Sequence, residues 1–142
     1  MADNPFRLVL AIILGFIIGV FINIFFGGFA SYLVDIYGDT HYKNPEKLIE
    51  GVNSIPLRSW LLTLIGAILG SFLGGLVGVS VDKKKRLLIP ILIGICLFIF
   101  PGVYIVIVTP APIWFNALNL FSYLIFSYLG GAYYLLTRTK NN

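Results

Sequence analysis

Four long runs of the chain contain no charged residue and no histidine. These runs are residues 8–34, 61–81, 87–108 and 113–136. Each run is longer than the roughly 20 residues that an α-helix needs to cross a hydrocarbon core about 30 Å thick. The polar–apolar alternation with period two that a transmembrane β-barrel requires is absent. The pattern therefore predicts an all-α membrane protein, a four-transmembrane-helix bundle that forms a single membrane domain over residues 1–142.

The residues around these runs set the expected helix boundaries. We expect helices at about 8–34, 59–81, 86–108 and 112–136, with an outer loop at 35–58. The first run is longer than the apolar region of a cleaved signal peptide, which is about 7–15 residues, so we expect a retained helix. In the outer loop, Asn44 and Pro45 are typical of a helix start, and Leu48, Ile49 and Val52 then share one face. This pattern predicts a short helix at the membrane surface.

Two of these helices carry small residues at every fourth position. The first helix contains Gly15, Gly19, Asn23 and Gly27, and the second contains Gly66, Gly70, Gly74 and Gly78. A helix face without side chains lets another backbone approach closely, which favours association in lipid. We therefore expect glycine-zipper packing of the first helix against the second. Asn23 is the strongly polar member of the first set, and we interpret it as an interhelical hydrogen-bond partner rather than a solute-binding residue.

Composition supports the membrane assignment and limits the chemistry. Hydrophobic residues make up 58% of the chain and charged residues 11%, and the mean hydropathy is +0.94. We therefore expect the chain to lie in a lipid bilayer and not to bind nucleic acid. One cysteine and one histidine cannot supply an internal disulfide, a four-thiolate metal site or a bis-histidine haem site. His41 lies near Asp35 and Asp39, but this loop is unpatterned. We therefore expect no metal and no cofactor.

Basic residues predict the orientation of the helices. The short loop after the second helix contains Lys83, Lys84, Lys85 and Arg86. Lysine and arginine near helix ends are retained on the cytoplasmic side, so this cluster is expected to be a cytoplasmic basic loop, with both termini cytoplasmic. The segments expected inside hold seven of the ten basic residues, whereas the outer loop holds three. The cluster could also bind anionic lipid or a partner, but its effect on topology explains it without either.

The last two helices carry the remaining features. Pro101 interrupts the third helix and is expected to kink it, because proline cannot donate the backbone hydrogen bond. The fourth helix carries a polar stripe at spacings of three and four residues, formed by Asn116, Asn119, Tyr123 and Ser127. With Asn23, this stripe is a possible ligand or partner face. We favour the interpretation that the stripe packs on another helix or on another subunit, since it contains no carboxylate, lysine, arginine or histidine.

The end of the chain resembles a known group of membrane proteins. Residues 109–120 read TPAPIWFNALNL, and the helix closes with Leu129-Gly130-Gly131. This pattern is similar to the final helix of small, uncharacterised four-helix membrane proteins of Bacteroidota-type bacteria. In that group an acid stands where this chain has Asn119, and a tryptophan precedes the Leu-Gly-Gly. The resemblance implies a bacterial inner (plasma) membrane and no particular activity.

Three classes of function remain. We expect an accessory or scaffolding subunit of a larger membrane complex, because smooth helix faces and aromatic residues suit contact with other subunits or self-association. The alternative is an oligomeric small-solute or ion channel or transporter that uses the polar stripe. Ion pathways usually contain buried charge, which these helices lack. An enzyme would need an acid, base, nucleophile or metal at membrane depth, so we do not expect one.

Overall fold

The computed structural model describes residues 5–37, 55, 57–82, 87–108 and 111–139, and its regular structure is helical throughout. The elements in chain order are α1 (Pro5–Tyr37), α3 (Leu57–Val81), α4 (Leu88–Leu97), the π-helix η1 (Phe98–Gly102), α5 (Val103–Val108) and α6 (Ile113–Thr139). Because α4, η1 and α5 follow one another without a break, the described chain forms four helices that are long and apolar enough to span a membrane. This confirms the predicted all-helical fold with four such helices. The expected surface helix at 44–52 and the basic cluster at 83–86 lie outside the described residues.

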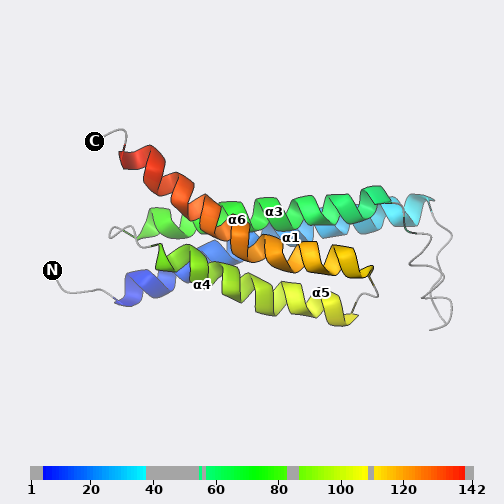
Figure 1. Ribbon diagram of the computed structural model, residues 1–142, viewed down its shortest axis with the longest axis horizontal. Helices are drawn as coiled ribbons and strands as arrows, with labels where there is room; N and C mark the ends of the chain where they lie inside the picture. Colours follow the sequence, from blue (N-terminus) through cyan, green and yellow to red (C-terminus); the bar gives the residue numbers. More distant parts are fainter. Residues whose placement is uncertain (1–4, 38–54, 56, 83–86, 109–110, 140–142) are drawn as a thin grey trace.

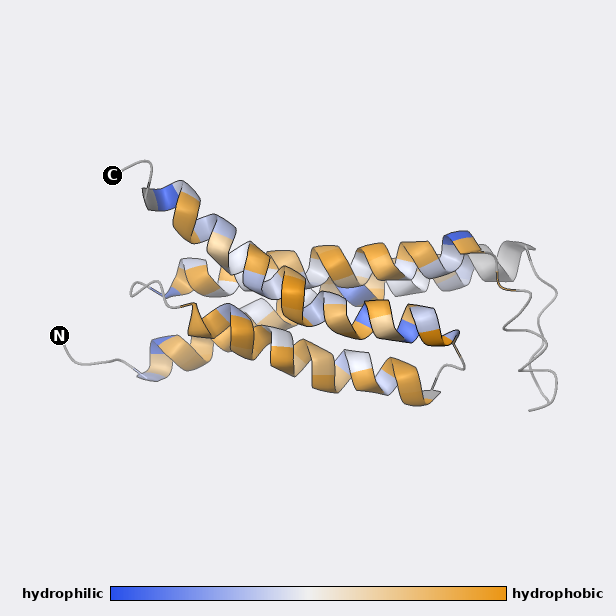
Figure 2. Cartoon of the chain, viewed as in Figure 1, coloured by the Kyte–Doolittle hydropathy of each residue, from blue (hydrophilic) through white to orange (hydrophobic). Residues whose placement is uncertain are grey.

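The four spans lie side by side along the long axis of the molecule (Figure 1). Their helices consist mainly of hydrophobic residues, as Figure 2 shows. α1 packs along α3, α3 also packs against α6, and α4 contacts all three of these helices. The start of α1 and the end of α6 lie at the same end of the bundle in Figure 1, as an even number of spans requires.

Glycines bring the backbones of α1 and α3 close together. A Cβ atom at Gly70 would lie 2.6 Å from the carbonyl oxygen of Gly19, and one at Gly74 would lie 2.6 Å from that of Gly15. Both separations are too short for a real Cβ contact, so the two helices can approach this closely only without side chains there.

The other predicted packing positions differ in what they contact. A Cβ atom at Gly66 would meet the Phe26 side chain of α1, whereas one at Gly78 would mainly meet isoleucine side chains of α4. Gly27 lies apart from this set, because a Cβ atom there would meet no heavy atom within 4 Å. The spacing of four residues continues to Gly27, but the close packing does not.

A second close contact joins α3 to α6. A Cβ atom at Gly75 would overlap the Ser127 carbonyl, and one at Gly130 would overlap the Phe72 carbonyl. Sequence analysis placed the glycine contact between the first two helices alone. Because Gly75 lies on a second face of α3, this helix makes close backbone contacts with α1 and α6 at once.

The third span continues through Pro101 as a turn of π-helix. The Val103 N–H bonds the carbonyl of Phe98, five residues back, instead of following the α-helical pattern. The expected interruption at Pro101 therefore takes the form of one wider turn. This turn contacts α6, where a Cβ atom at Gly102 would lie 3.1 Å from the Tyr123 ring.

Candidate functional site

A pocket of about 540 Å³ lies between α1, the start of α3, the η1–α5 segment and the start of α6. We call this pocket the groove. Several side chains on its walls, including Ile24, Phe100 and Tyr104, are more than 60% exposed, so the groove opens sideways, toward the surroundings of the bundle. Its volume is within the range of about 300–1,000 Å³ that small-molecule sites occupy.

The groove exists because α1 and the third span separate beyond η1. α1 packs against α4 but does not pack along α5. On the α1 side, Gly27 and Gly28 line the groove without side chains, and a Cβ atom at either would meet nothing within 4 Å. The π-turn and the two glycines together leave a space that ordinary helix packing would fill.

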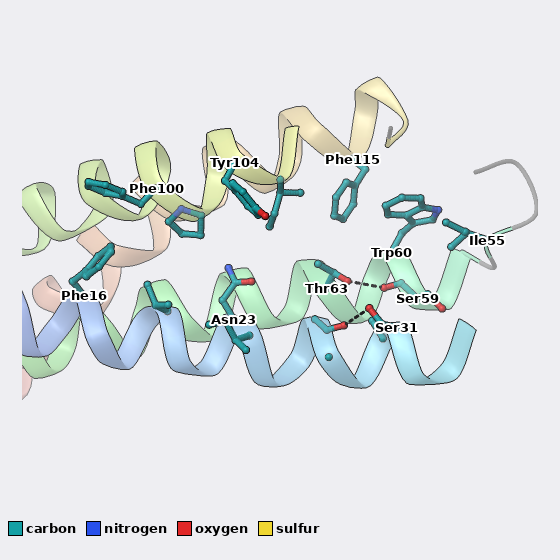
Figure 3. A pocket seen from close by; sticks show the side chains of 17 residues that line it. Phe16, Asn23, Ser31, Ile55, Ser59, Trp60, Thr63, Phe100, Tyr104 and Phe115 are labelled. Atoms are coloured by element: carbon teal, nitrogen blue, oxygen red, sulfur yellow. Dashed lines mark hydrogen bonds between the residues drawn. The ribbon is translucent and has the colours of Figure 1, made fainter. Parts of the chain in front are cut away.

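Aromatic rings form much of the wall. Phe16 of α1 and Phe100 of η1 meet edge to face, with ring centroids 5.8 Å apart. At the other end, Trp60 of α3 and Phe115 of α6 lie with centroids 4.8 Å apart. Figure 3 shows Tyr104 between these two pairs. Rings of this kind provide large apolar contact area for a ligand.

A few polar side chains interrupt this apolar surface. Asn23 projects into the space between α1 and α5 (Figure 3), and its amide nitrogen donates a hydrogen bond to the hydroxyl of Tyr123. Ser31 and Thr63 donate to carbonyls of their own helices, at 3.0 Å to Gly27 and 3.1 Å to Ser59. These two bonds occupy the hydroxyl protons, so both residues present mainly oxygen lone pairs to the groove.

Ser59 differs from these residues. It is 4% exposed, and its hydroxyl has no hydrogen-bond partner within the described chain. A buried hydroxyl without a partner costs roughly 1–3 kcal/mol, so it is uncommon in a native protein. Because Ser59 also lines the groove, a bound ligand could supply the missing partner.

The polar stripe predicted on the fourth helix lies elsewhere. Asn119, Tyr123 and Ser127 are almost completely buried inside the bundle, and none of them lines the groove. The Ser127 hydroxyl donates to the Pro90 carbonyl at 2.6 Å, and the half-buried Asn116 donates to the Ala111 carbonyl at 3.3 Å. Three of the four side chains are therefore enclosed by neighbouring residues of this chain, and the fourth, Asn116, is half-buried. Asn119 lies beside the Tyr123 hydroxyl, but neither of its amide atoms has a partner with hydrogen-bond geometry.

Asn23 and Gly27 are the candidate residues from the sequence that line the groove. The sequence did not single out Thr63 or Tyr104, because each lies alone among apolar residues, and it did not single out Ser59, which follows Arg58 at the start of the second span. A usable signal was the spacing of Ser59 and Thr63, which puts two hydroxyls on the same helix face as the neighbouring Trp60. No group of three or more possible metal ligands occurs among the described residues.

No protein-family model matches this chain, and neither a curated protein nor a solved structure is significantly similar to it. The groove is therefore interpreted from its own geometry.

Proposed function

We propose that this chain is an accessory subunit of a larger complex in the bacterial inner membrane, and that it binds a lipophilic molecule in the groove. The main support is the groove itself. Its volume suits a small molecule, its walls are aromatic, and it opens sideways from the bundle. Sites for small molecules are mostly apolar clefts with a few placed polar groups, and the groove has this character.

Lipophile binding agrees better with these residues than conduction does. The stripe that a channel would use is enclosed by packing, and the groove lining contains no carboxylate, lysine, arginine or histidine. Ion pathways through membranes usually need such groups or rings of polar atoms. For the same reason we propose a binding role and not an enzymatic one.

The rest of the proposal concerns how the bundle supports the site. The contacts of Gly15 and Gly19 with Gly74 and Gly70 favour a glycine zipper between α1 and α3, which would make one rigid wall of the groove. We further propose that both termini and residues 83–86 are cytoplasmic, on the strength of the basic residues. The outer loop and its proposed surface helix would then lie at the end of the groove that Ser31 and Ser59 line.

Gentle detergent extraction of the tagged protein tests this function. We expect mass spectrometry to find partner subunits in stoichiometric amounts and a retained lipophilic molecule. The variant Gly27→Phe should lose the lipophile while remaining folded, because its ring would enter open space in the groove.

Ala117→Phe is the matched control, because it adds the same ring at an exposed position of α6 outside the groove. Recovery of a lone protein without a lipophile would refute both parts of the proposal. Equal retention by the two variants would show that the lipophile binds outside the groove.

A further inference from the structure

The register of α1 and α3 gives the length of the groove. Gly15 lies opposite Gly74 and Gly19 opposite Gly70, so each step forward along α1 matches one step back along α3. Continuing this register places Ser59 level with Ala30, which also lines the groove. At 1.5 Å per residue, Asn23 is then about 10 Å from the Ser59 level, and Phe16 is about 10 Å further on.

This length of about 20 Å corresponds to one half of a membrane. The bilayer with its headgroup regions is about 40 Å thick, so one leaflet contributes about 20 Å. Phe16 lies near the middle of the candidate span Pro5–Tyr32, whereas Ser59 and Trp60 lie near the start of the span Leu57–Val81. The groove therefore runs from the middle of the membrane to one of its surfaces.

The surface end of the groove supplies a hydrogen-bond donor at Ser59. This residue is the third of α3. The buried Ser59 hydroxyl has no partner of its own among the described residues, so it can donate to an acceptor on the ligand. No charged side chain lines this end of the groove, so the acceptor is expected to be neutral.

We propose that the groove takes the acyl chain of a glycerolipid, and that the Ser59 hydroxyl hydrogen-bonds the ester carbonyl of that chain. This inference rests on the proposed function and specifies its ligand. An ester carbonyl is a neutral acceptor at the boundary between the hydrocarbon and the headgroups, which is the depth of Ser59. The chain below it would lie along Val20 and Ile24 and end near the Phe16–Phe100 pair.

The volume of the groove, about 540 Å³, lies within the range of about 300–1,000 Å³ that small-molecule sites occupy. A single acyl chain is slender enough to enter from the side.

Binding of matched ester and ether lipids tests the inference. Native mass spectrometry would compare phosphatidylcholines with identical chains, one with ester links and one with ether links, which lack the carbonyl. The wild-type protein should bind the ester lipid about 2- to 10-fold more tightly than the ether lipid, because one hydrogen bond raises affinity by about this factor. Ser59→Ala should remove this preference and keep the fold, because it deletes a hydroxyl without a partner.

Two variants complete the design. Ser80→Ala removes an exposed hydroxyl at the other end of α3 and should keep the ester preference. Gly27→Phe should weaken binding of both lipids, because its ring would occupy the groove. An ester preference that persists in Ser59→Ala would refute the role of Ser59. Equal wild-type affinity for both lipids would refute the ester contact and leave groove binding intact, whereas no binding of either would also refute the proposed function.

Discussion

At the scale of single residues, the space beside a glycine decides the effect of replacing it. Gly70→Ala should destabilise the protein by about 1–3 kcal/mol, because its Cβ atom would lie 2.6 Å from the Gly19 carbonyl and push α1 away from α3. Gly28→Ala should instead be neutral or stabilise by up to about 1 kcal/mol, since it meets no atom and alanine favours a helix. Unfolding in detergent micelles measures both. Equal effects of the two changes would mean that the backbones of α1 and α3 are not in contact.

A second prediction at this scale concerns the buried pair of Asn23 and Tyr123. The amide of Asn23 donates to the Tyr123 hydroxyl between two helices. A double-mutant cycle with Asn23→Leu and Tyr123→Phe should give a coupling energy of about 0.6 kcal/mol and at most about 1.7 kcal/mol, the average and the maximum measured for such bonds in membranes. Strictly additive effects on unfolding would show that the bond does not contribute to stability.

The candidate residues show how far the sequence alone could predict this site. The spacing of four residues selected Gly15, Gly19, Gly70 and Gly74, each of which faces a backbone atom of the opposite helix. The same spacing selected Gly27, which faces open space, because periodicity identifies a helix face and does not show where two helices diverge. The Asn23 amide donates to Tyr123 of α6, so its hydrogen bond joins the first and fourth spans and not the first and second. The role of Ser59 depends on its burial, which only the packed structure provides.

At the scale of elements, hydropathy predicted the spans, but it did not predict the π-turn that lines the groove. The expected range 86–108 corresponds to α4, η1 and α5 together. Proline predicted an interruption there, since it lacks the N–H that an α-helix needs. Its consequence for α5 could not be predicted, because the direction of a helix after a π-turn depends on what the turn packs against. Here η1 packs on α6, whereas α5 does not pack along α1.

Replacing Pro101 tests the link between this turn and the groove. Pro101→Ala restores a backbone donor, which should favour a continuous α-helix. A π-helical turn contains about one residue more than an α-helical turn. If this segment became α-helical, α5 would rotate by about 100° relative to α4, and Tyr104 would leave the groove wall. We expect unchanged or higher thermal stability and weaker retention of the lipophile. Retention at the wild-type level would show that the π-turn does not shape the site.

At the scale of the whole molecule, the distribution of charge is expected to decide which leaflet supplies the lipid. The end of the groove at Ser59 lies where α1 ends and α3 begins (Figure 1), and residues 38–54 connect these two helices in the sequence. That loop region is balanced in charge, with three basic and four acidic residues over 35–58, whereas residues 82–86 contain four basic residues and one acid. Positive loops remain in the cytoplasm, so the groove is expected to open into the outer leaflet of the inner membrane.

Cysteine labelling checks this orientation. Cys96 is the single cysteine of the chain, so Cys96→Ser gives a background without thiols. In that background, a maleimide that cannot cross membranes should label Glu50→Cys on intact spheroplasts and should label Lys84→Cys only after permeabilisation. The reverse result would place the loop at 38–54 in the cytoplasm and assign the lipid to the inner leaflet. The contacts of the acyl chain within the groove would be unchanged, because they depend on the bundle and not on its orientation.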